Sequence, residues 1–175
     1  DELWRLLRQG ELDLTLSSLP VVVPEDLQVI ELLRDDLCIV VREYHPLMAQ
    51  RRLKIGDLQA VQWLLPGPDV AARRQVEALL AQAGLPAPRM ALEISNTTGH
   101  MGQILRETDL VSMMSTSMLA GAPGQGLAVL PIAQARIKRS VGITLLKQGA
   151  RQPLAERFIE LLQAVAAAGP VPGRL

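Results

Sequence analysis

The sequence predicts an α/β fold of two lobes with mainly parallel sheets, joined by a hinge of two crossovers. Apolar runs with strand spacing alternate with helical stripes along most of the 175 residues. Residues 43–46 and 131–138 interrupt this alternation with proline and charged side chains. The interruptions predict a first lobe of residues 1–43 and 133–168, a second lobe of residues 44–132 and a tail of residues 169–175. A groove between two such lobes is a natural ligand site.

The first elements lie within LLRQGELDLTL, residues 6–16. Leucines recur at helical spacing up to Gly10, which suits the positive φ of a helix C-terminus. Leu12, Leu14 and Leu16 then alternate with polar residues, which predicts a strand that buries these leucines. Because the helix comes at residue 1 with no strand before it, we expect that a preceding segment belongs to the same fold.

The next elements are two β-rich runs, residues 27–34 and 37–42, which a short turn should place side by side. A strand at residues 62–65 precedes a helix with Asp69 as its expected N-cap and Gly84 at its end. Strands at residues 90–94, 110–114 and 127–130 alternate with helices that begin near Met101 and after Ser115.

A last strand at residues 140–146 leads to a helix that begins at Pro153, a favoured first helical position. Its apolar residues recur at helical spacing and predict one core-facing side: Leu154, Phe158, Leu161, Leu162 and Val165.

Composition excludes several classes of function. Eighteen basic and eighteen acidic residues give zero formal net charge, which excludes the basic surface of a domain that grips nucleic acid by itself. The single cysteine, Cys38, stands in an apolar run and reads as a buried, inert thiol in a reducing compartment. No transmembrane stretch or signal peptide is visible, so we expect a cytoplasmic protein without a membrane partner.

The sequence shows no catalytic or metal-binding pattern. His45 and His100 are the only histidines and do not share a metal-ligand spacing with each other or with the cysteine. His45 precedes a proline and reads as an exposed turn residue, and His100 reads as a packing or solvent-facing residue. Neither glycine-rich stretch has the order of a nucleotide-binding motif. We therefore expect no enzyme activity, no metal and no cofactor.

Small polar, glycine or proline residues follow four predicted strands. In an open α/β sheet, ligands bind at the carboxyl ends of strands, where backbone N–H groups and helix N-termini favour anions. The alternative is simple N-capping, which the same residue types prefer. Their recurrence predicts a cleft lined by Ser17, Ser18, Pro66, Gly67, Ser95, Asn96, Thr97 and Ser115.

Several of these stretches resemble one family. LLRQGELDLTL is similar to the Leu-x-x-Gly-Glu-Leu-Asp-Leu motif of the effector-binding domain of LysR-type transcriptional regulators. LCIVVREYHPL at residues 37–47 resembles that family's strand, hinge and His-Pro-Leu turn. WLLP at residues 63–66, AGLP at residues 83–86 and the loop at residues 93–97 follow in the family's order.

The resemblance implies a periplasmic-binding-protein-like (type 2) pair of lobes that binds a small organic, anionic effector. It also implies a DNA-binding helix-turn-helix domain before residue 1, and a homodimer or homotetramer in which Leu3, Trp4 and Leu7 contribute to the interface. Glu107-Thr108-Asp109 and Met114-Ser115 replace the family's usual glycine-rich turn and Leu-Pro pair, so the effector's identity does not carry over.

Two alternatives remain open beside a ligand-sensing regulator domain. A solute-binding protein of a transport system would share the fold class but work outside the cytoplasm. An enzyme is the weaker of the two alternatives, because the sequence shows no nucleophile–base pair and no set of metal ligands.

Overall fold

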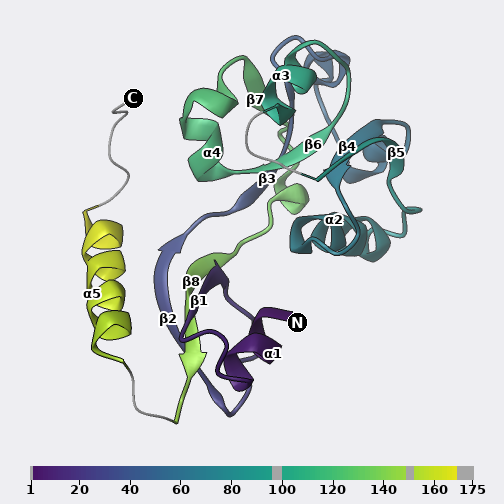
Figure 1. Cartoon of the computed structure of the whole chain (residues 1–175). Coiled ribbons are helices and arrows are strands. Elements are labelled where there is room, and N and C mark those ends of the chain that lie inside the picture. Colours follow the sequence, from purple (N-terminus) through teal and green to yellow (C-terminus); the bar gives the residue numbers. More distant parts are fainter. Residues whose placement is uncertain (1, 96–99, 149–151, 169–175) are drawn as a thin grey trace. The chain divides into compact units, whose positions relative to one another are not determined.

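The chain forms two compact units, which are described here one at a time. The computed structural model describes residues 2–95, 100–148 and 152–168 (Figure 1). Unit 1 comprises residues 1–35 and 138–175, and unit 2 comprises residues 36–137. The chain therefore passes between the units after residues 35 and 137, whereas the sequence placed these crossings after residues 43 and 132. The first crossing comes earlier because the strand at residues 37–42 pairs only with strands of unit 2 in the described structure.

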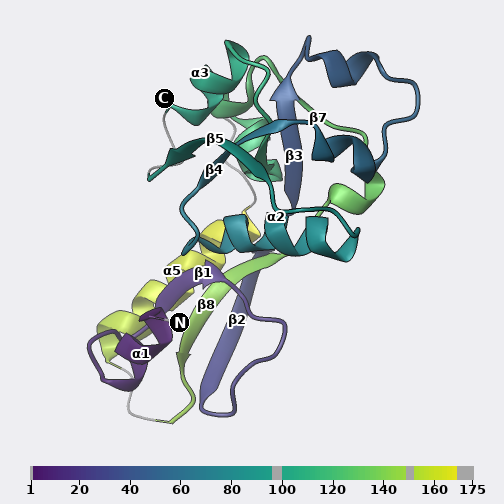
Figure 2. The same cartoon turned by 90° about the vertical axis from the view of Figure 1, so that its right-hand side faces the viewer.

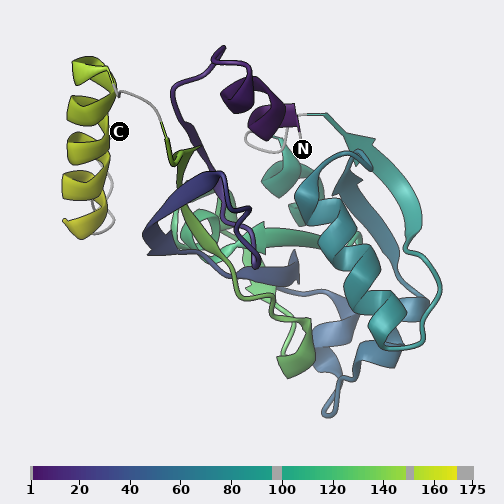
Figure 3. The same cartoon turned by 90° about the horizontal axis from the view of Figure 1, so that it is seen from below.

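Unit 1 is a three-stranded sheet with two helices. Its elements are α1 (Glu2–Arg8), β1 (Thr15–Ser18), β2 (Leu27–Arg34), β8 (Ser140–Leu146) and α5 (Pro153–Ala167). The strand order is β1-β8-β2, with β8 antiparallel to both neighbours. Helix α1 contacts β8, and α5 contacts β2. Figure 3 shows α1 (purple) and α5 (yellow-green) apart from each other within this unit. Ile143 and Leu145 of β8 pack with Ile159 of α5 to form the core of this unit.

The first turn of the fold agrees only partly with the sequence prediction. Gly10 has a φ of 73° and donates its N–H to the Leu7 carbonyl over 3.1 Å, as expected of a helix end. In the strand, however, Thr15 is buried and Leu16 is 51% exposed, so the prediction that Leu16 is buried is wrong. Strand β1 lies at the edge of the sheet, and α5 contacts β2 on the other side of β8, which leaves Leu16 uncovered.

Helix α5 begins at Pro153 as predicted, but its expected core-facing side is mostly exposed. Ile159 is buried and Leu162 packs beside it. The other predicted core residues are exposed and were therefore wrongly assigned to the core: Leu154, Phe158, Leu161 and Val165. Helix α5 contacts the sheet mainly at β2, so only part of its apolar side is covered.

Unit 2 contains the remaining elements. Its strands are β3 (Leu37–Arg42), β4 (Gln62–Pro66), β5 (Arg89–Ile94), β6 (Ser112–Ser115) and β7 (Leu127–Val129). Its α-helices are α2 (Ala71–Gln82), α3 (Met101–Arg106) and α4 (Thr116–Ala120). Four 3₁₀-helices complete it: η1 (Pro46–Ala49), η2 (Ile55–Gln59), η3 (Ala122–Gly124) and η4 (Ala133–Ala135).

The sheets are mixed, which corrects the expectation of mainly parallel sheets while the α/β class is confirmed. Strands β4 and β5 are parallel and lie side by side in Figure 2. Strand β3 is antiparallel to both β6 and β7. In unit 2, strands that are joined through α-helices are parallel. Strands β3 and β8 each follow directly after the chain passes from one unit to the other, and both are antiparallel to their neighbours. The predicted pairing of residues 27–34 with residues 37–42 is wrong, because β2 and β3 belong to different units.

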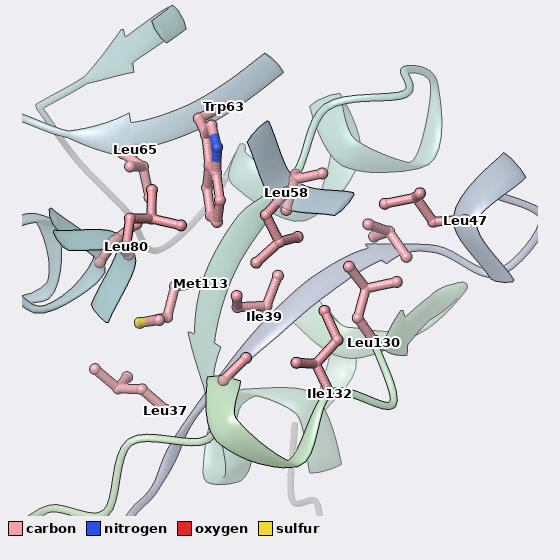
Figure 4. Packing of buried hydrophobic residues seen from close by; sticks show 14 residues of the cluster. Leu37, Ile39, Leu47, Leu58, Trp63, Leu65, Leu80, Met113, Leu130 and Ile132 are labelled. Carbon is pink, nitrogen blue, oxygen red and sulfur yellow. The ribbon is translucent and has the colours of Figure 1, made fainter. Parts of the chain in front are cut away.

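The core of unit 2 gathers side chains from β3, β4 and β6, from α2 and from the 3₁₀-helices η1, η2 and η4 (Figure 4). Trp63 of β4 is fully buried beside Ile39 of β3 and Met113 of β6. Helix α2 contributes Leu80, as its apolar stripe predicted, but Val70 rather than Asp69 is its N-cap, without a side-chain hydrogen bond.

The lone cysteine is buried as expected. None of the helices in the described ranges is both long and apolar enough to cross a membrane.

Candidate functional site

Three strands of unit 2 run in one direction and end at the same edge, which we call the carboxyl edge. Pro66 at the end of β4 pairs with Ile94 at the end of β5. Strand β6 continues from Val111, whose N–H and carbonyl bond to Gln62 and Leu64 of β4 over 2.9 Å each in a parallel bridge. Ligands of open α/β sheets bind at such an edge.

Four of the predicted site residues lie at the carboxyl edge: Pro66, Gly67, Ser95 and Ser115. Gly67 and Ser95 each come directly after the paired strand ends, and Ser115 is the last residue of β6. Asn96 and Thr97 lie outside the described residues. These four predicted residues come from the ends of three strands that are separated along the chain, and the fold places them at one edge.

The hydroxyl of Ser115 caps a helix, in keeping with the alternative that the sequence left open. Its Oγ accepts the N–H of Met118 over 3.3 Å and lies 3.0 Å from the Ser117 Oγ. The residue is only 4% exposed. Capping is thus one role of Ser115, and any ligand bond must use its remaining hydrogen-bonding capacity.

Two charged side chains near this edge were missed by sequence reasoning. Arg73 lies in the first turn of α2, where its Nη1 is 3.5 Å from the Pro66 carbonyl oxygen and its Nε donates to Glu77 over 2.6 Å. Glu93 lies near Gly67, since a Cβ placed on that glycine would be 3.5 Å from the Glu93 Oε1. The sequence did contain one signal for Arg73. A cation in the first turn of a helix is unfavourable because it opposes the helix dipole, so its presence there calls for another role.

Ser17 and Ser18 end β1 in unit 1, where they pair with Gly142 and Val141 of β8. Both are half-buried. The Ser18 Oγ accepts a hydrogen bond from the Nη1 of Arg139 over 3.2 Å. Nothing near Ser18 in the sequence indicates this arginine, because it lies 121 positions further along the chain.

His45 is buried rather than exposed, which corrects the sequence interpretation. Its Nδ1 accepts the N–H of Leu47 over 3.0 Å, so that nitrogen carries no proton in this contact. Its Nε2 lies 3.1 Å from the Asp109 carbonyl oxygen and must therefore be the N–H donor. His45 is a structural residue with both ring nitrogens engaged.

A groove of about 1040 Å³ lies at the opposite end of β4 and β5, beside His45, Gln62 and Arg89. Of the predicted site residues that the structure describes, none lines this groove. His100 is exposed at the start of α3 and makes no capping side-chain bond there. Within residues 2–95, 100–148 and 152–168, no group of three His, Cys, Asp or Glu residues could hold a metal ion.

The candidate interface residues of α1 differ in exposure. Leu7 is fully buried within the chain, Trp4 is half-buried and Leu3 is 39% exposed. Leu7 therefore supports the core, and of these three residues Leu3 and Trp4 are accessible at the surface.

Curated relatives match almost the whole chain. The chain is 28% identical over 169 residues to the HTH-type transcriptional regulator GbpR of Azospirillum brasilense, covering 94% of this chain and 48% of that protein. It is 27% identical over 161 residues to the HTH-type transcriptional regulator GalR of Pseudomonas putida, covering 91% of this chain and 40% of that protein. The chain thus spans about half or less of the length of these relatives.

Solved structures share the fold. The regulatory domain of CcmR from Synechocystis in complex with 2-PG superposes with a TM-score of 0.80 at 22% identity, covering 97% of this chain and 81% of that one. The effector-binding domain of QuiR in complex with shikimate gives a TM-score of 0.73 at 20% identity, covering 97% of this chain and 79% of that one. The family model described as the LysR substrate binding domain matches residues 1–167, and the chain belongs to this family.

Proposed function

We propose that the chain is the effector-sensing part of a cytoplasmic LysR-type transcription regulator and that it binds a small, hydroxyl-bearing organic anion. The match of residues 1–167 to the LysR substrate binding domain carries this proposal. The solved structures of two relatives at low identity are complexes with 2-PG and with shikimate, and shikimate is the anion of a small hydroxy acid. Binding would shift an equilibrium between conformations by no more than the difference in affinity for them.

The charges at the carboxyl edge support the chemical class of the effector. The N-terminus of the 12-residue helix α2 and the Arg73 guanidinium both favour a negative group beside Pro66 and Gly67. The Glu93 carboxylate near Gly67 repels an anion but accepts a hydrogen bond from a hydroxyl. In the proposed complex, an anionic head accepts from the Arg73 guanidinium, which also pairs with Glu77, and a hydroxyl of the ligand donates to Glu93.

The other predicted residues complete the proposed site. Ser95 and Ser115 follow β5 and β6 at the carboxyl edge, and Asn96 and Thr97 continue from Ser95 along the chain. Ser17 and Ser18 are the proposed contribution of unit 1, through hydroxyl groups at the end of β1.

The relatives favour regulation over transport. GbpR and GalR are transcriptional regulators, and the solved neighbours named above are regulatory domains, so a solute-binding protein of a transport system is not favoured. These relatives are not enzymes. We propose that DNA is bound through a helix-turn-helix domain of the longer protein, and that the chain forms a homodimer or homotetramer in which Leu3 and Trp4 contribute.

A thermal-shift screen with organic acids, including 2-PG and shikimate, tests the proposal. We expect at least one hydroxy acid to raise the melting temperature and to bind in isothermal titration calorimetry. Arg73→Gln should weaken that affinity roughly 10- to 100-fold, the effect of losing a charge-assisted hydrogen bond of about 1.5–3 kcal/mol. Arg74→Gln is the matched control, since Arg74 is exposed and its Nη1 bonds to the Asp69 carbonyl.

Unchanged affinity in both Arg73→Gln and Ser17→Ala would show that the binding residues are wrongly assigned. If none of the acids shifts the melting temperature, the proposed class of effector is refuted. Sedimentation of the chain as a strict monomer at high concentration would contradict the interface role of Leu3 and Trp4.

A further inference from the structure

The two segments that connect the units are hydrogen-bonded to each other on both sides of the crossing. On the unit 1 side, the Asp35 N–H donates to the Arg139 carbonyl over 3.2 Å. On the unit 2 side, Leu37 and Ile137 exchange two backbone bonds of 2.9 Å each in an antiparallel bridge. The connecting segments therefore form a short two-stranded ribbon.

Arg139 holds this ribbon by its side chain as well. Its Nε donates to the Asp35 carbonyl over 2.7 Å, and its Nη2 donates to the Asp35 Oδ2 over 3.1 Å. The third nitrogen, Nη1, donates to the Ser18 Oγ over 3.2 Å. The guanidinium of Arg139, the residue before β8, thus joins the end of β1 to Asp35, the last residue of unit 1 before the first crossing.

The low exposure of this network makes it different from an ordinary surface pair. The side chains of Arg139 and Asp35 are 21% and 9% exposed. Removing one partner of such a pair leaves a poorly solvated charge without compensation. Arg136 and Asp36 form a second pair of 2.9 Å on the unit 2 side, but the Arg136 side chain is 58% exposed. Exposed pairs contribute only about 0–1 kcal/mol.

We propose that Arg139 is a positioning residue that couples Ser18 to the hinge ribbon. A group that engages the Ser18 hydroxyl competes with or strengthens its bond to Arg139, and the same guanidinium holds Asp35. By reciprocity, a change in the ribbon alters the placement of the Ser18 hydroxyl. The assignment of Ser18 to effector binding rests on the proposed function, whereas the restraint of the ribbon by Arg139 does not.

The experiment measures the restraint directly, in the chain without any ligand. Spin labels on Gln82→Cys of α2 and Gln163→Cys of α5 report the distribution of distances by double electron–electron resonance. Both positions are exposed, and the natural cysteine, Cys38, is buried and is not expected to take a label. Amide hydrogen exchange at Asp35, relative to Leu37 in unit 2, reports the ribbon itself.

Arg139→Gln should broaden the distance distribution and speed exchange at the Asp35 amide at least about tenfold, since about 1.4 kcal/mol is a factor of ten. Arg139→Lys keeps the charge beside Asp35, but one ammonium cannot replace the planar fork that bonds both Asp35 and Ser18. We expect a wild-type melting temperature for this variant together with a broadened distribution, which a purely structural role would not produce.

The controls separate coupling from general loosening. Arg136→Gln makes the same substitution in the exposed pair and should leave the distribution unchanged. Ser18→Ala should broaden it, whereas Ser17→Ala should not, because the Ser17 Oγ contacts the Ser18 carbonyl instead.

A wild-type distribution in Arg139→Lys and Ser18→Ala, or equal broadening in Arg136→Gln, would overturn the proposal. If Arg139→Gln does not fold, the other two variants still decide. Because no effector is present, this failure would leave the proposed sensing function standing, and a failed effector screen would leave the restraint by Arg139 standing.

Discussion

Replacing Thr144 by valine should stabilise the protein, although it removes a polar group from a β-strand. Thr144 is fully buried in β8 and pairs with Thr15 of β1, which is 5% exposed. Within the described residues, neither hydroxyl has a hydrogen-bond partner. On the other side of Thr144, the paired residue in β2 is Val29, so a valine side chain already occupies this row of the sheet.

The size of the effect follows from the cost of an unsatisfied hydroxyl. Burial of such a group costs about 1–3 kcal/mol in proteins, and valine keeps the shape of threonine with a similar preference for strands. We expect Thr144→Val to raise the free energy of unfolding by about 1 kcal/mol, and the double variant with Thr15→Val by about twice that. Urea unfolding measures both values, and the melting temperature should rise by about 2–4 °C per kcal/mol.

Thr108→Val is the matched control because its hydroxyl is satisfied. The Thr108 Oγ1 donates to the Ile104 carbonyl over 2.8 Å and accepts the Leu110 N–H over 3.4 Å. The same substitution should therefore lower the free energy of unfolding. If Thr144→Val is instead destabilising by as much as Thr108→Val, the conclusion that the Thr144 hydroxyl is unsatisfied is wrong.

Three further predictions concern other positions. Gly142→Ala places a Cβ 2.2 Å from the backbone oxygen of Ile30, so it should lower the free energy of unfolding in urea by about 1–3 kcal/mol or more. His45→Ala removes both bonds of a buried ring and should cost about 2–4 kcal/mol by the same measurement, with a smaller loss in His45→Asn, which keeps a capping acceptor. The hydrogen bonds from Arg8 lower the pKa of Asp26, so this pair stabilises the fold above the ordinary carboxyl pKa and loses its effect as the pH falls below about 4. The stability difference between wild type and Arg8→Gln should shrink over that range, and a constant difference down to pH ~2 would contradict it.

Much of the fold could be predicted because local signals and tertiary packing agree. Gly10 and Gly84 have the positive φ values of helix ends, 73° and 70°, that their sequence positions indicated. Pro153 begins α5, and Leu80 of α2 lies in the core of unit 2. These features depend on residues close together in the chain, whose preferences are visible in the sequence.

The wrong predictions concern residues whose burial or pairing depends on an element far away in the chain. The alternation of Leu12, Leu14 and Leu16 indicates a strand, but exposure of Leu16 depends on which strand α5 covers. The turn between β2 and β3 looks like a hairpin, yet each strand finds its partners more than 70 residues away, in β8 and in β6 and β7. His45 was assigned to the surface because its partner, the Asp109 carbonyl, is 64 positions away.

The candidate site shows the same division between local and distant determinants. The preference of Ser115 for the end of a strand and the start of a helix is local, and it explains both its position at the carboxyl edge and its capping bond. The charges that choose a ligand are set by tertiary structure, since Glu93 meets Gly67 only because β4 and β5 pair in parallel. Arg139 reaches Ser18 only because β8 returns between β1 and β2. A small polar residue after a strand therefore indicates where a site can form, whereas strand pairing decides which arginines and carboxylates lie beside it.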